Sequence, residues 1–419
     1  MMTGRERVLS LLSKAHTEGA YSNIALDAEL GKSDAERAFI TALFYGVVER
    51  RMTLDHIIRS HSKTEFDDIE NETLQLLRMG LYQLLYMDIP ESAAVNETVK
   101  LAPERSKGFI NAVLRAFIRS GRNIDLDGLD ELGKLSVGYS CARWIVKMWV
   151  NCYGAGKTEE MLKTSFGRPP VFARVNTTVC DADDLIYELA EDGVKSEAFG
   201  ESDTCVLITG SGSIERLRAY RSGLFHVQDL SSQKCCELLA PRAGDTVIDM
   251  CAAPGGKSFT IAEIMENKGA VWSSDLYESR VKLIKEGAER LGLGIINARV
   301  ADASVYDETL PKADRVLCDV PCSGLGVIRR KPEIKYKKKA DIEGLPEIQR
   351  AILDNAARYV KKGGRLVYST CTLNRAENED IAEAFAAENA DFRLIDMKTY
   401  FPDENGGDGF FTAFFERKA

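Results

Sequence analysis

The second half of the chain alternates strand-like and helix-like segments, and this alternation restricts the fold more than any other feature. From about residue 226, short apolar runs such as TVIDM, AVWSS, ADRVLCDV and RLVYST are separated by longer amphipathic segments such as KSFTIAEIMEN, YESRVKLIKEGAERLG and PEIQRAILDNAARYV. Parallel strands need a crossover between them, so this pattern predicts a doubly wound, mostly parallel sheet with helices on both faces. We expect residues 226–419 to form such a Rossmann-like α/β domain.

The first 225 residues have a different pattern and predict two further domains. Residues 1–135 contain amphipathic segments with apolar residues at helical spacing, such as Phe39, Leu43 and Val47. A stack of such helices with short loops is typical of a small all-α bundle. Residues 136–225 combine one more helix with the β-rich run PPVFARVNTTV and the acidic-capped helix DADDLIYELAEDG. This mixture predicts a small α+β module with an antiparallel sheet.

Composition and charge exclude several classes of protein. The 419 residues carry a net charge of −9, which argues against indiscriminate coating of nucleic acid. The start, MMTGRERVLSLLSKA, does not resemble a signal peptide, and no run approaches the ~18 apolar residues of a membrane span. Ten cysteines are scattered without a Cys-x-x-Cys pair. The most closely spaced ones, Cys235 with Cys236 and Cys318 with Cys322, do not form a zinc-binding pattern with any of the four histidines. We therefore expect a cytoplasmic protein with reduced thiols and no structural metal. We also expect a monomer, although the sequence holds no signal for the oligomeric state.

The segment TVIDMCAAPGGKS runs from a strand through a Gly-rich turn into a helix, and three nucleotide-binding interpretations compete for it. A P-loop needs a glycine where Cys251 stands, and the dinucleotide pattern Gly-x-Gly-x-x-Gly is absent. S-adenosylmethionine needs small residues in the turn and a carboxylate for the ribose hydroxyls. Asp275 lies 20 residues after Gly255 at a strand end, which is the spacing this role requires, and Asp302 could then hold the adenine amino group. The plainer alternative is a glycine turn with capping aspartates.

Two cysteines come just after strand-like runs. Cys322 follows ADRVLCDV, and Cys371 follows RLVYST. In a doubly wound sheet the ligand crevice lies beyond the carboxyl ends of the strands, so we expect both thiols to face it. Cys251 and Cys318 lie within or beside apolar runs and are interpreted as packing residues, which is the usual role of a buried cysteine.

A thiol beside a methyl donor has a chemical use. Carbon 5 of a pyrimidine is a poor nucleophile, but a thiolate that adds to carbon 6 makes carbon 5 able to attack a sulfonium methyl group. Such covalent catalysis divides one difficult step into two. The adduct must then lose the carbon-5 proton and expel the thiol, and a second polar group could serve this release. Asp319, at a strand end beside Pro321, suits stabilisation of the charge that develops, or is simply a capping aspartate.

The chain closely resembles the bacterial 16S ribosomal RNA cytosine-5 methyltransferases of the RsmB (Sun/Fmu) family. The resemblance rests on DMCAAPGGKS, DVPCSGLGVIRRKPEIKY, YSTCTLNRAENE, GGDGFF and VQDLSSQ. YSNIALDAEL and KGFINAVLRAFIR in the N-terminal part resemble the NusB-type RNA-binding domain that this family carries. The resemblance covers essentially the whole chain. It implies methyl transfer from S-adenosylmethionine to cytosine 967 of 16S rRNA, in the conventional numbering of that RNA.

The resemblance also implies a role for each residue of the motifs. Cys371 is the nucleophile that attacks carbon 6, and Cys322 assists breakdown of the adduct and product release. Asp319 hydrogen-bonds the cytosine ring near N3 and lies close to the cofactor. Asp275 and Asp302 hold the ribose and the adenine. The loop that binds S-adenosylmethionine consists of Cys251, Ala252, Ala253, Pro254, Gly255, Gly256 and Lys257.

Two stretches are rich in basic residues. IRRKPEIKYKKK, after the Cys322 turn, has seven positive charges against Glu333, with Tyr336 interleaved, and residues 100–122 have six against Glu104. Such runs neutralise phosphates, although they also occur on ordinary solvated surfaces. The target cytosine must leave any base stack to reach Cys371, which favours a single-stranded or loop substrate.

Other functions remain open from the sequence alone. A tRNA cytosine is a possible substrate, because the catalytic chemistry is the same. A non-catalytic RNA-binding or ribosome assembly factor would bind RNA without methyl transfer, and the intact cysteine pair argues against it. A P-loop-like NTPase would explain GGKS, and the missing first glycine argues against it.

Overall fold

The computed structural model of the chain describes residues 2–18, 34–200, 203–210, 212–402 and 406–419. The segment YSNIALDAEL therefore lies outside the described residues. The chain divides into two compact units, Met1–Gly167 with Ile328–Lys337, and Arg168–Val327 with Lys338–Ala419. Among the described helices, none is long and apolar enough to cross a membrane.

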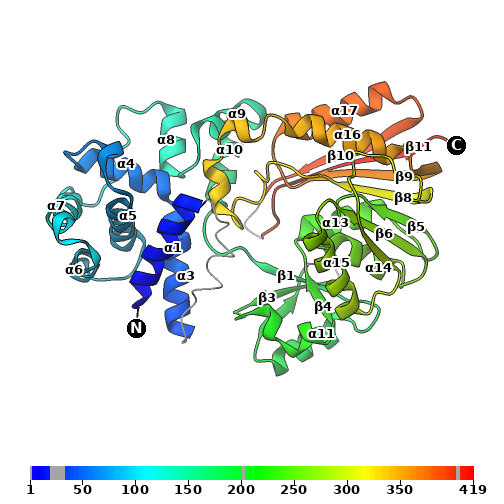
Figure 1. Ribbon diagram of the computed structural model, residues 1–419, viewed down its shortest axis with the longest axis horizontal. Helices are drawn as coiled ribbons and strands as arrows, with labels where there is room; N and C mark the ends of the chain where they lie inside the picture. Colours follow the sequence, from blue (N-terminus) through cyan, green and yellow to red (C-terminus); the bar gives the residue numbers. More distant parts are fainter. Residues whose placement is uncertain (1, 19–33, 201–202, 211, 403–405) are drawn as a thin grey trace. The chain divides into compact units, whose positions relative to one another are not determined.

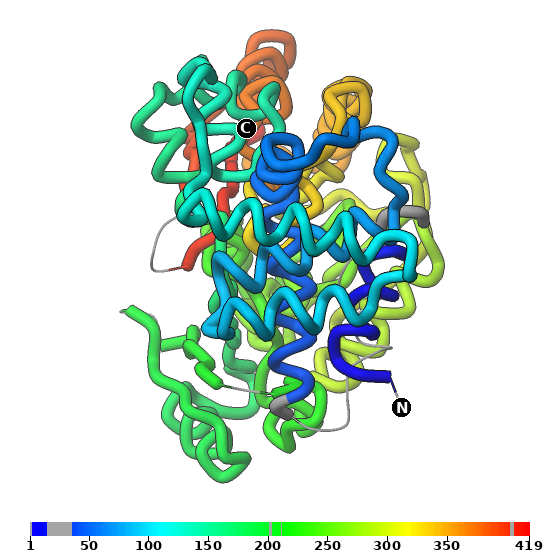
Figure 2. Tube along the Cα trace, turned by 90° about the vertical axis from the view of Figure 1, so that its left-hand side faces the viewer, coloured from blue at the N-terminus to red at the C-terminus, as the bar shows by residue number. Residues whose placement is uncertain are grey.

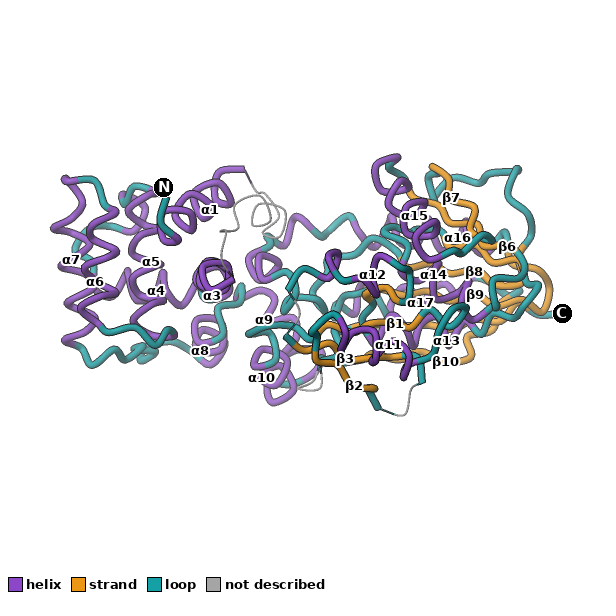
Figure 3. The backbone as a smooth tube through the Cα atoms, turned by 90° about the horizontal axis from the view of Figure 1, so that it is seen from below, coloured by secondary structure: helices purple, strands orange, loops and turns teal. Residues whose placement is uncertain are grey.

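The first unit is built from helices alone, and every described strand lies in the second unit (Figure 3). The helices of the first unit are α1 (Gly4–Glu18), α3 (Asp34–Glu49), α4 (Arg51–His61), α5 (Asn71–Tyr86), α6 (Glu91–Leu101), α7 (Glu104–Arg119), α8 (Glu131–Gly138), α9 (Arg143–Tyr153) and α10 (Ala155–Lys163). Helices α5, α6 and α7 pack against one another (Figure 2). In α7 the residues Ile110, Val113, Leu114 and Phe117 are buried at the three- and four-residue spacing that defines one helix face. This confirms the predicted helical bundle.

A segment from the middle of the second unit's sequence folds into this helical unit. Residues 328–337 contain a short 3-10 helix, Pro332–Tyr336, which contacts α3. The Tyr336 hydroxyl donates to Val48 O at 2.6 Å and bonds Ser140 Oγ at 2.9 Å. Lys335 is 0% exposed, and its Nζ lies 3.6 Å from the centroid of the Phe166 ring. The interpretation of IRRKPEIKYKKK as one RNA-facing patch is therefore wrong for Lys335, which no phosphate can reach.

Burial gives Lys335 a measurable effect on stability. Loss of solvation lowers the pKa of Lys335 to about 7, although the nearby Cys141 and Glu49 oppose this shift. Between pH 7 and the ordinary lysine value, the unfolded chain holds a proton that the folded chain lacks, so stability should rise with pH. In the wild type, this effect raises the free energy of unfolding by up to about 1.4 kcal/mol per pH unit. We expect Lys335→Met to remove this contribution.

The measurement is urea unfolding of the wild type and the variant between pH 7.5 and 9. Tryptophan fluorescence reports on this unit, since Trp144 and Trp149 lie in α9. The other titrating groups are common to both proteins and cancel in the difference. Equal slopes for the two proteins would show that Lys335 keeps its proton in the folded state.

The second unit begins with a small antiparallel sheet. Its strands, in the order β2-β3-β1-β4, are β1 (Val171–Val175), β2 (Lys195–Ala198), β3 (Cys205–Thr209) and β4 (Phe225–Val227). Helix α11 (Ala182–Glu191) packs on this sheet, and α12 (Arg218–Arg221) follows in sequence. Asp181 caps α11 by accepting from Asp184 N at 2.9 Å, as the acidic start of this helix predicted. The predicted α+β module is thus confirmed, while its boundaries at residues 136 and 225 stay predictions.

The large sheet carries the predicted doubly wound topology. Its strands are β5 (Thr246–Asp249), β6 (Ala270–Asp275), β7 (Ile296–Val300), β8 (Ala313–Asp319), β9 (Val360–Thr370), β10 (Phe392–Tyr400) and β11 (Phe410–Arg417). Their order is β10-β11-β9-β8-β5-β6-β7, where β9 to β7 are parallel and β11 pairs antiparallel with both β9 and β10 at one edge. The strand order reverses between β5 and β8, and ligands bind at such a switch point.

Helices cover both faces of this sheet (Figure 1). On one face α16 (Leu345–Ala357) and α17 (Glu379–Glu388) pack through Leu353 and Phe385. On the other face lie α13 (Leu230–Leu239), α14 (Gly256–Ile264) and α15 (Glu278–Leu291), packed through Leu239, Ile261 and Ile284. Two separate apolar clusters result, one on each face, and this confirms the predicted mostly parallel α/β domain.

Candidate active site

The glycine loop joins β5 to α14 at the strand switch point. Gly255 is the residue before α14 and has a φ of +116°, and a Cβ there would lie 2.3 Å from the Phe259 ring. Both the backbone conformation and the close ring explain why this position needs glycine. The loop therefore turns tightly and brings its backbone to the carboxyl ends of β5 and β8.

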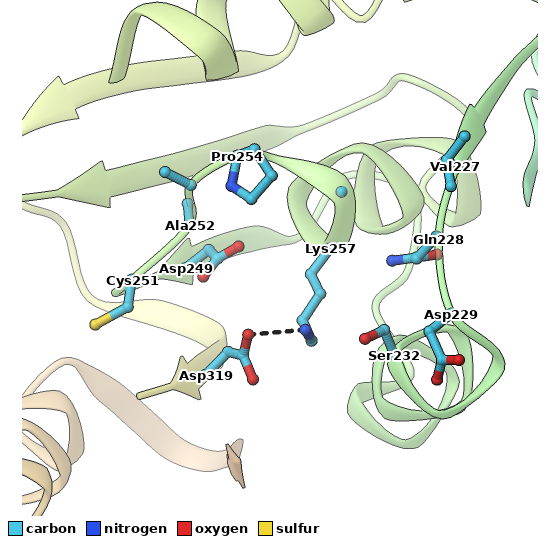
Figure 4. A pocket seen from close by; sticks show the side chains of 12 residues that line it. Val227, Gln228, Asp229, Ser232, Asp249, Cys251, Ala252, Pro254, Lys257 and Asp319 are labelled. Atoms are coloured by element: carbon cyan, nitrogen blue, oxygen red, sulfur yellow. Dashed lines mark hydrogen bonds and ion pairs between the residues drawn. The ribbon is translucent and has the colours of Figure 1, made fainter. Parts of the chain in front are cut away.

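A pocket opens where β5 and β8 end, and we call it the strand-end pocket. Its volume is about 180 Å³. Figure 4 shows its lining, which consists of Val227, Gln228, Asp229, Ser232, Asp249, Cys251, Ala252, Ala253, Pro254, Gly256, Lys257 and Asp319. Seven of the residues singled out in the sequence thus lie in one pocket. Gly255, Asp275 and Asp302 are outside the lining.

An ion pair lies at the centre of the pocket. Lys257 Nζ donates to Asp319 Oδ2 at 2.7 Å (Figure 4). Burial alone would lower the pKa of Lys257, but the charge of Asp319 outweighs it and raises that pKa above the ordinary lysine value. Asp319 Oδ1 accepts from Ser369 Oγ at 2.8 Å, which fixes the carboxylate from its other side. The pair is therefore charged and held in one orientation.

Two further polar groups of the pocket lack a complete set of partners. Asp249, at the end of β5, is 0% exposed, and Ser258 Oγ donates to its Oδ2 at 2.7 Å. Burial raises the pKa of Asp249 to about 7. Gln228 is 6% exposed, and its Oε1 accepts from Thr260 Oγ1 at 2.7 Å. Asp249 Oδ1 and Gln228 Nε2 are buried and have no hydrogen-bond partner within the described part of the chain.

The other two predicted aspartates have different surroundings. Asp275 is buried at the end of β6, where its Oδ2 accepts from Ala253 N at 3.3 Å and pairs with Arg280 at 3.3 Å. It therefore holds the glycine loop in place. Asp302 is exposed beyond β7 and accepts from the backbone and hydroxyl of Ser304, which lower its pKa. Its predicted contact with adenine stays a prediction.

The two cysteines predicted at strand ends lie side by side. Cys322 Sγ and Cys371 Sγ are 3.2 Å apart, and both side chains are partly exposed. The hydrogen bond with Cys371, reinforced by burial, raises the pKa of Cys322 well above its ordinary value. Neither thiol is among the residues that line the strand-end pocket. Ser369, two residues before Cys371, connects them to it by its bond to Asp319.

Two glycine-containing segments meet behind the cysteines. Gly326 N donates to Cys371 O at 3.0 Å, and Gly409 N donates to Gly326 O at 2.9 Å. A Cβ at position 326 would lie only 2.0 Å from Gly409 O. This close backbone approach explains why GLG and GGDGFF both carry glycine here.

Sequence reasoning missed three side chains of this region. Asp249 could have been found, since it ends the strand before the glycine loop. Gln228 lies in the segment VQDLSSQ, but no sequence pattern indicated a function for its side chain. Glu377 lies in RAENE, whose helical pattern indicates an exposed surface, yet it is fully buried beside the cysteines.

The second basic stretch, residues 100–122, is partly neutralised by its own neighbours. Four of its side chains form ion pairs with glutamates: Lys100 with Glu97, Arg105 with Glu70, Lys107 with Glu104, and Arg122 with Glu91. The local excess of positive charge is therefore smaller than the sequence count indicates.

Three family models match separate parts of the chain. The model described as 16S rRNA methyltransferase RsmB/F matches residues 236–416, and the NusB family model matches residues 2–119. A third, described as the ferredoxin-like domain of RsmF/B-like methyltransferases, matches residues 141–215.

Relatives match nearly the full length. The probable ribosomal RNA small subunit methyltransferase B of Bacillus subtilis (strain 168) is 40% identical, with 93% of this chain and 89% of that protein covered. The ribosomal RNA small subunit methyltransferase B of Escherichia coli O127:H6 is 32% identical, with 94% and 93% covered. The crystal structure of PH0851 aligns with a TM-score of 0.82 at 25% identity, covering 100% of this chain and 99% of its own.

Proposed function

Since the chain belongs to the family of ribosomal RNA small subunit methyltransferase B, we propose that it methylates carbon 5 of cytosine 967 of 16S rRNA through a covalent cysteine adduct. Membership makes the chain an S-adenosylmethionine-dependent methyltransferase of ribosomal RNA. The observation that carries the covalent route is the pair of thiols 3.2 Å apart, one residue beyond β9 and three beyond β8. We further propose that it works as a monomer in the cytoplasm.

The strand-end pocket fits the amino-acid end of S-adenosylmethionine. That end carries an ammonium and a carboxylate, and the buried, unpartnered Asp249 Oδ1 and Gln228 Nε2 provide one acceptor and one donor for them. Small side chains in the loop, Ala252, Ala253 and Gly256, leave room for a close approach. When bound, the cofactor supplies an electrophilic methyl group on a positively charged sulfur.

Cofactor affinity should therefore depend on pH through Asp249. Its carboxylate is ionised above about pH 7 and protonated below, so it attracts an ammonium group only at the higher pH. We expect affinity for S-adenosylmethionine to fall between pH 7.5 and 5.5 by up to about tenfold per pH unit. Calorimetric titration measures this.

Asp249→Asn should weaken binding at pH 7.5 and flatten the pH dependence. The matched control is Asp391→Asn, at an exposed aspartate, which should leave both unchanged. An Asp249→Asn protein that keeps the wild-type pH profile would exclude Asp249 from cofactor binding.

The chemical role of Cys371 follows from its place beyond β9. Its thiolate forms a bond to carbon 6 of the cytosine, and the electron pair moves towards N3. Carbon 5 then becomes nucleophilic enough to take the methyl group. Cys371 leaves when the carbon-5 proton is lost, because the electron pair of that bond restores the ring double bond and breaks the sulfur–carbon bond.

Lys257 and Asp319 are placed to stabilise the charge that develops at N3. The two residues of this ion pair together present one donor and one acceptor to the pocket. We propose that this pair orients the cytosine ring edge.

Cys322 is the group proposed to assist release. Because its pKa is raised, it stays a neutral thiol beside Cys371. Cys322 can give its proton to the departing Cys371 sulfur across their 3.2 Å contact. The carbon-5 proton of the cytosine passes to Cys322 at the same time. Both cysteines then end as neutral thiols, and Cys371 releases one proton to solvent to become the thiolate of the next cycle.

The experiment that tests this function uses 16S rRNA from a strain that lacks the corresponding gene. We expect the protein to transfer methyl from labelled S-adenosylmethionine to this RNA and bisulfite sequencing to place it at cytosine 967. Transfer to tRNA alone, or RNA binding without transfer, would contradict the proposal.

A further inference from the structure

We propose that Glu377 is a positioning residue whose carboxylate fixes the two cysteine-bearing turns against each other and thereby sets the Cys322–Cys371 geometry. The proposal rests on the roles given above to the two cysteines. It follows from the hydrogen bonds that converge on one side chain, which is 0% exposed.

Both oxygens of Glu377 are occupied. Oε2 accepts from Ser323 N at 2.8 Å and from Gln349 Nε2 at 2.9 Å. Oε1 accepts from Ser323 Oγ at 2.6 Å and from Asn374 Nδ2 at 2.9 Å. Four donors therefore meet one carboxylate, and a carboxylate is the side chain that can accept all of them at once.

These donors come from both catalytic turns. Ser323 directly follows Cys322, and Asn374 lies three residues after Cys371. Gln349, from α16, also donates to Pro321 O at 3.0 Å, immediately before Cys322. Removing the carboxylate would leave both turns without their shared acceptor.

A second bond across the turns shows how close they are. Ser323 Oγ lies 2.6 Å from Thr372 Oγ1, the residue after Cys371. The Ser323 hydroxyl has one proton, which it donates to Glu377. Thr372 must therefore be the donor in its bond with Ser323, so Glu377 also sets the direction of this bond. Bonds on both sides of Cys322, and on the C-terminal side of Cys371, thus depend on Glu377.

The burial of Glu377 has no simpler electrostatic reason. Within the described part of the chain, no lysine or arginine forms an ion pair with this side chain. A buried carboxylate held only by neutral donors is costly, and a merely structural position would be filled more cheaply by an apolar residue. Positioning of the thiols gives the carboxylate a use.

The first test measures geometry without RNA or cofactor. The oxidant diamide converts two adjacent thiols to a disulfide as it is itself reduced, and the rate depends on how well the second sulfur is placed. Peptide mass spectrometry follows the linked peptides of Cys322 and Cys371. We expect this rate to fall about tenfold or more in Glu377→Ala and less in Glu377→Gln, which keeps one acceptor oxygen. Glu383→Gln, at an exposed glutamate of α17, is the control and should react like the wild type.

The second test measures the reaction. We expect kcat to fall about 100-fold in Glu377→Ala, with unchanged affinity for S-adenosylmethionine and with accumulation of the protein–RNA adduct, because Cys322 is misplaced for release. Glu377→Gln should recover part of kcat. A variant that is merely less folded would lose activity in proportion to its folded fraction, with an unchanged ratio of adduct to product.

The two tests separate the proposal from the function on which it rests. An unchanged diamide rate in Glu377→Ala, or loss of activity that follows the folded fraction alone, overturns the positioning role. A slowed diamide rate with full methyl transfer supports the positioning role and overturns the catalytic roles of the cysteines. If Glu377→Ala does not fold, Glu377→Gln carries both measurements.

Discussion

Replacing Cys371 with alanine should abolish methyl transfer to 16S rRNA while leaving cofactor binding intact. The thiol is the only group proposed to bond carbon 6, and without this bond carbon 5 remains unreactive. Loss of a nucleophile typically costs a factor of about 10³ or more in kcat. Cys371 is not part of the pocket lining, so the affinity for S-adenosylmethionine should change less than about twofold.

The measurement is single-turnover transfer from labelled S-adenosylmethionine, with calorimetric cofactor titration alongside. Cys318→Ala is the matched control, because Cys318 is a fully buried cysteine in β8 that packs in the core. It should lower stability and keep the activity of the folded fraction. Substantial transfer by Cys371→Ala would remove Cys371 from the mechanism.

Replacing Cys322 with alanine should trap the enzyme on its RNA. The adduct forms because Cys371 is intact, but the 3.2 Å sulfur contact that supports release is lost. Product formation should fall by about 100-fold, and a protein–RNA complex should survive denaturation. A denaturing gel with labelled RNA measures the fraction of enzyme that is trapped.

The Cys322→Ala, Cys371→Ala double variant provides the control for trapping. It should form no complex that resists denaturation, because the nucleophile is absent. If Cys322→Ala turns over normally and traps nothing, the release role is wrong. A complex that persists in the double variant would mean that another residue bonds the RNA.

The sheet and its helices could be predicted from local sequence patterns. Strands β5, β6, β8 and β9 lie in the apolar runs TVIDM, AVWSS, ADRVLCDV and RLVYST. These runs could be recognised because the patterns that distinguish strands from amphipathic helices involve only residues close together in sequence. The fold of residues 328–337 could not be predicted in this way. Its run of charges indicates a solvated surface, but Lys335 is buried by α3 and Phe166, which lie far away in sequence.

The candidate site was predictable to the extent that strand ends converge. Asp319, Cys322 and Cys371 lie close together, as expected, because carboxyl ends of adjacent parallel strands meet at one edge of the sheet, while their roles stay predictions. Glu377 and the Lys257–Asp319 pair were not predicted. Their partners lie 54 and 62 residues away, and such distances appear only once the sheet is assembled.

The covalent bond of Cys371 is tested most directly with the wild-type enzyme and a 16S rRNA transcript containing 5-fluorocytidine. Fluorine at carbon 5 cannot be removed as a proton, so the adduct should stay attached after methyl transfer. Nuclease and trypsin digestion then separates the two cysteines, because Cys371 falls in LVYSTCTLNR and Cys322 in VLCDVPCSGLGVIR. We predict a methylated fluorocytidine on LVYSTCTLNR; the nucleotide on the Cys322 peptide, or on neither, would contradict the account.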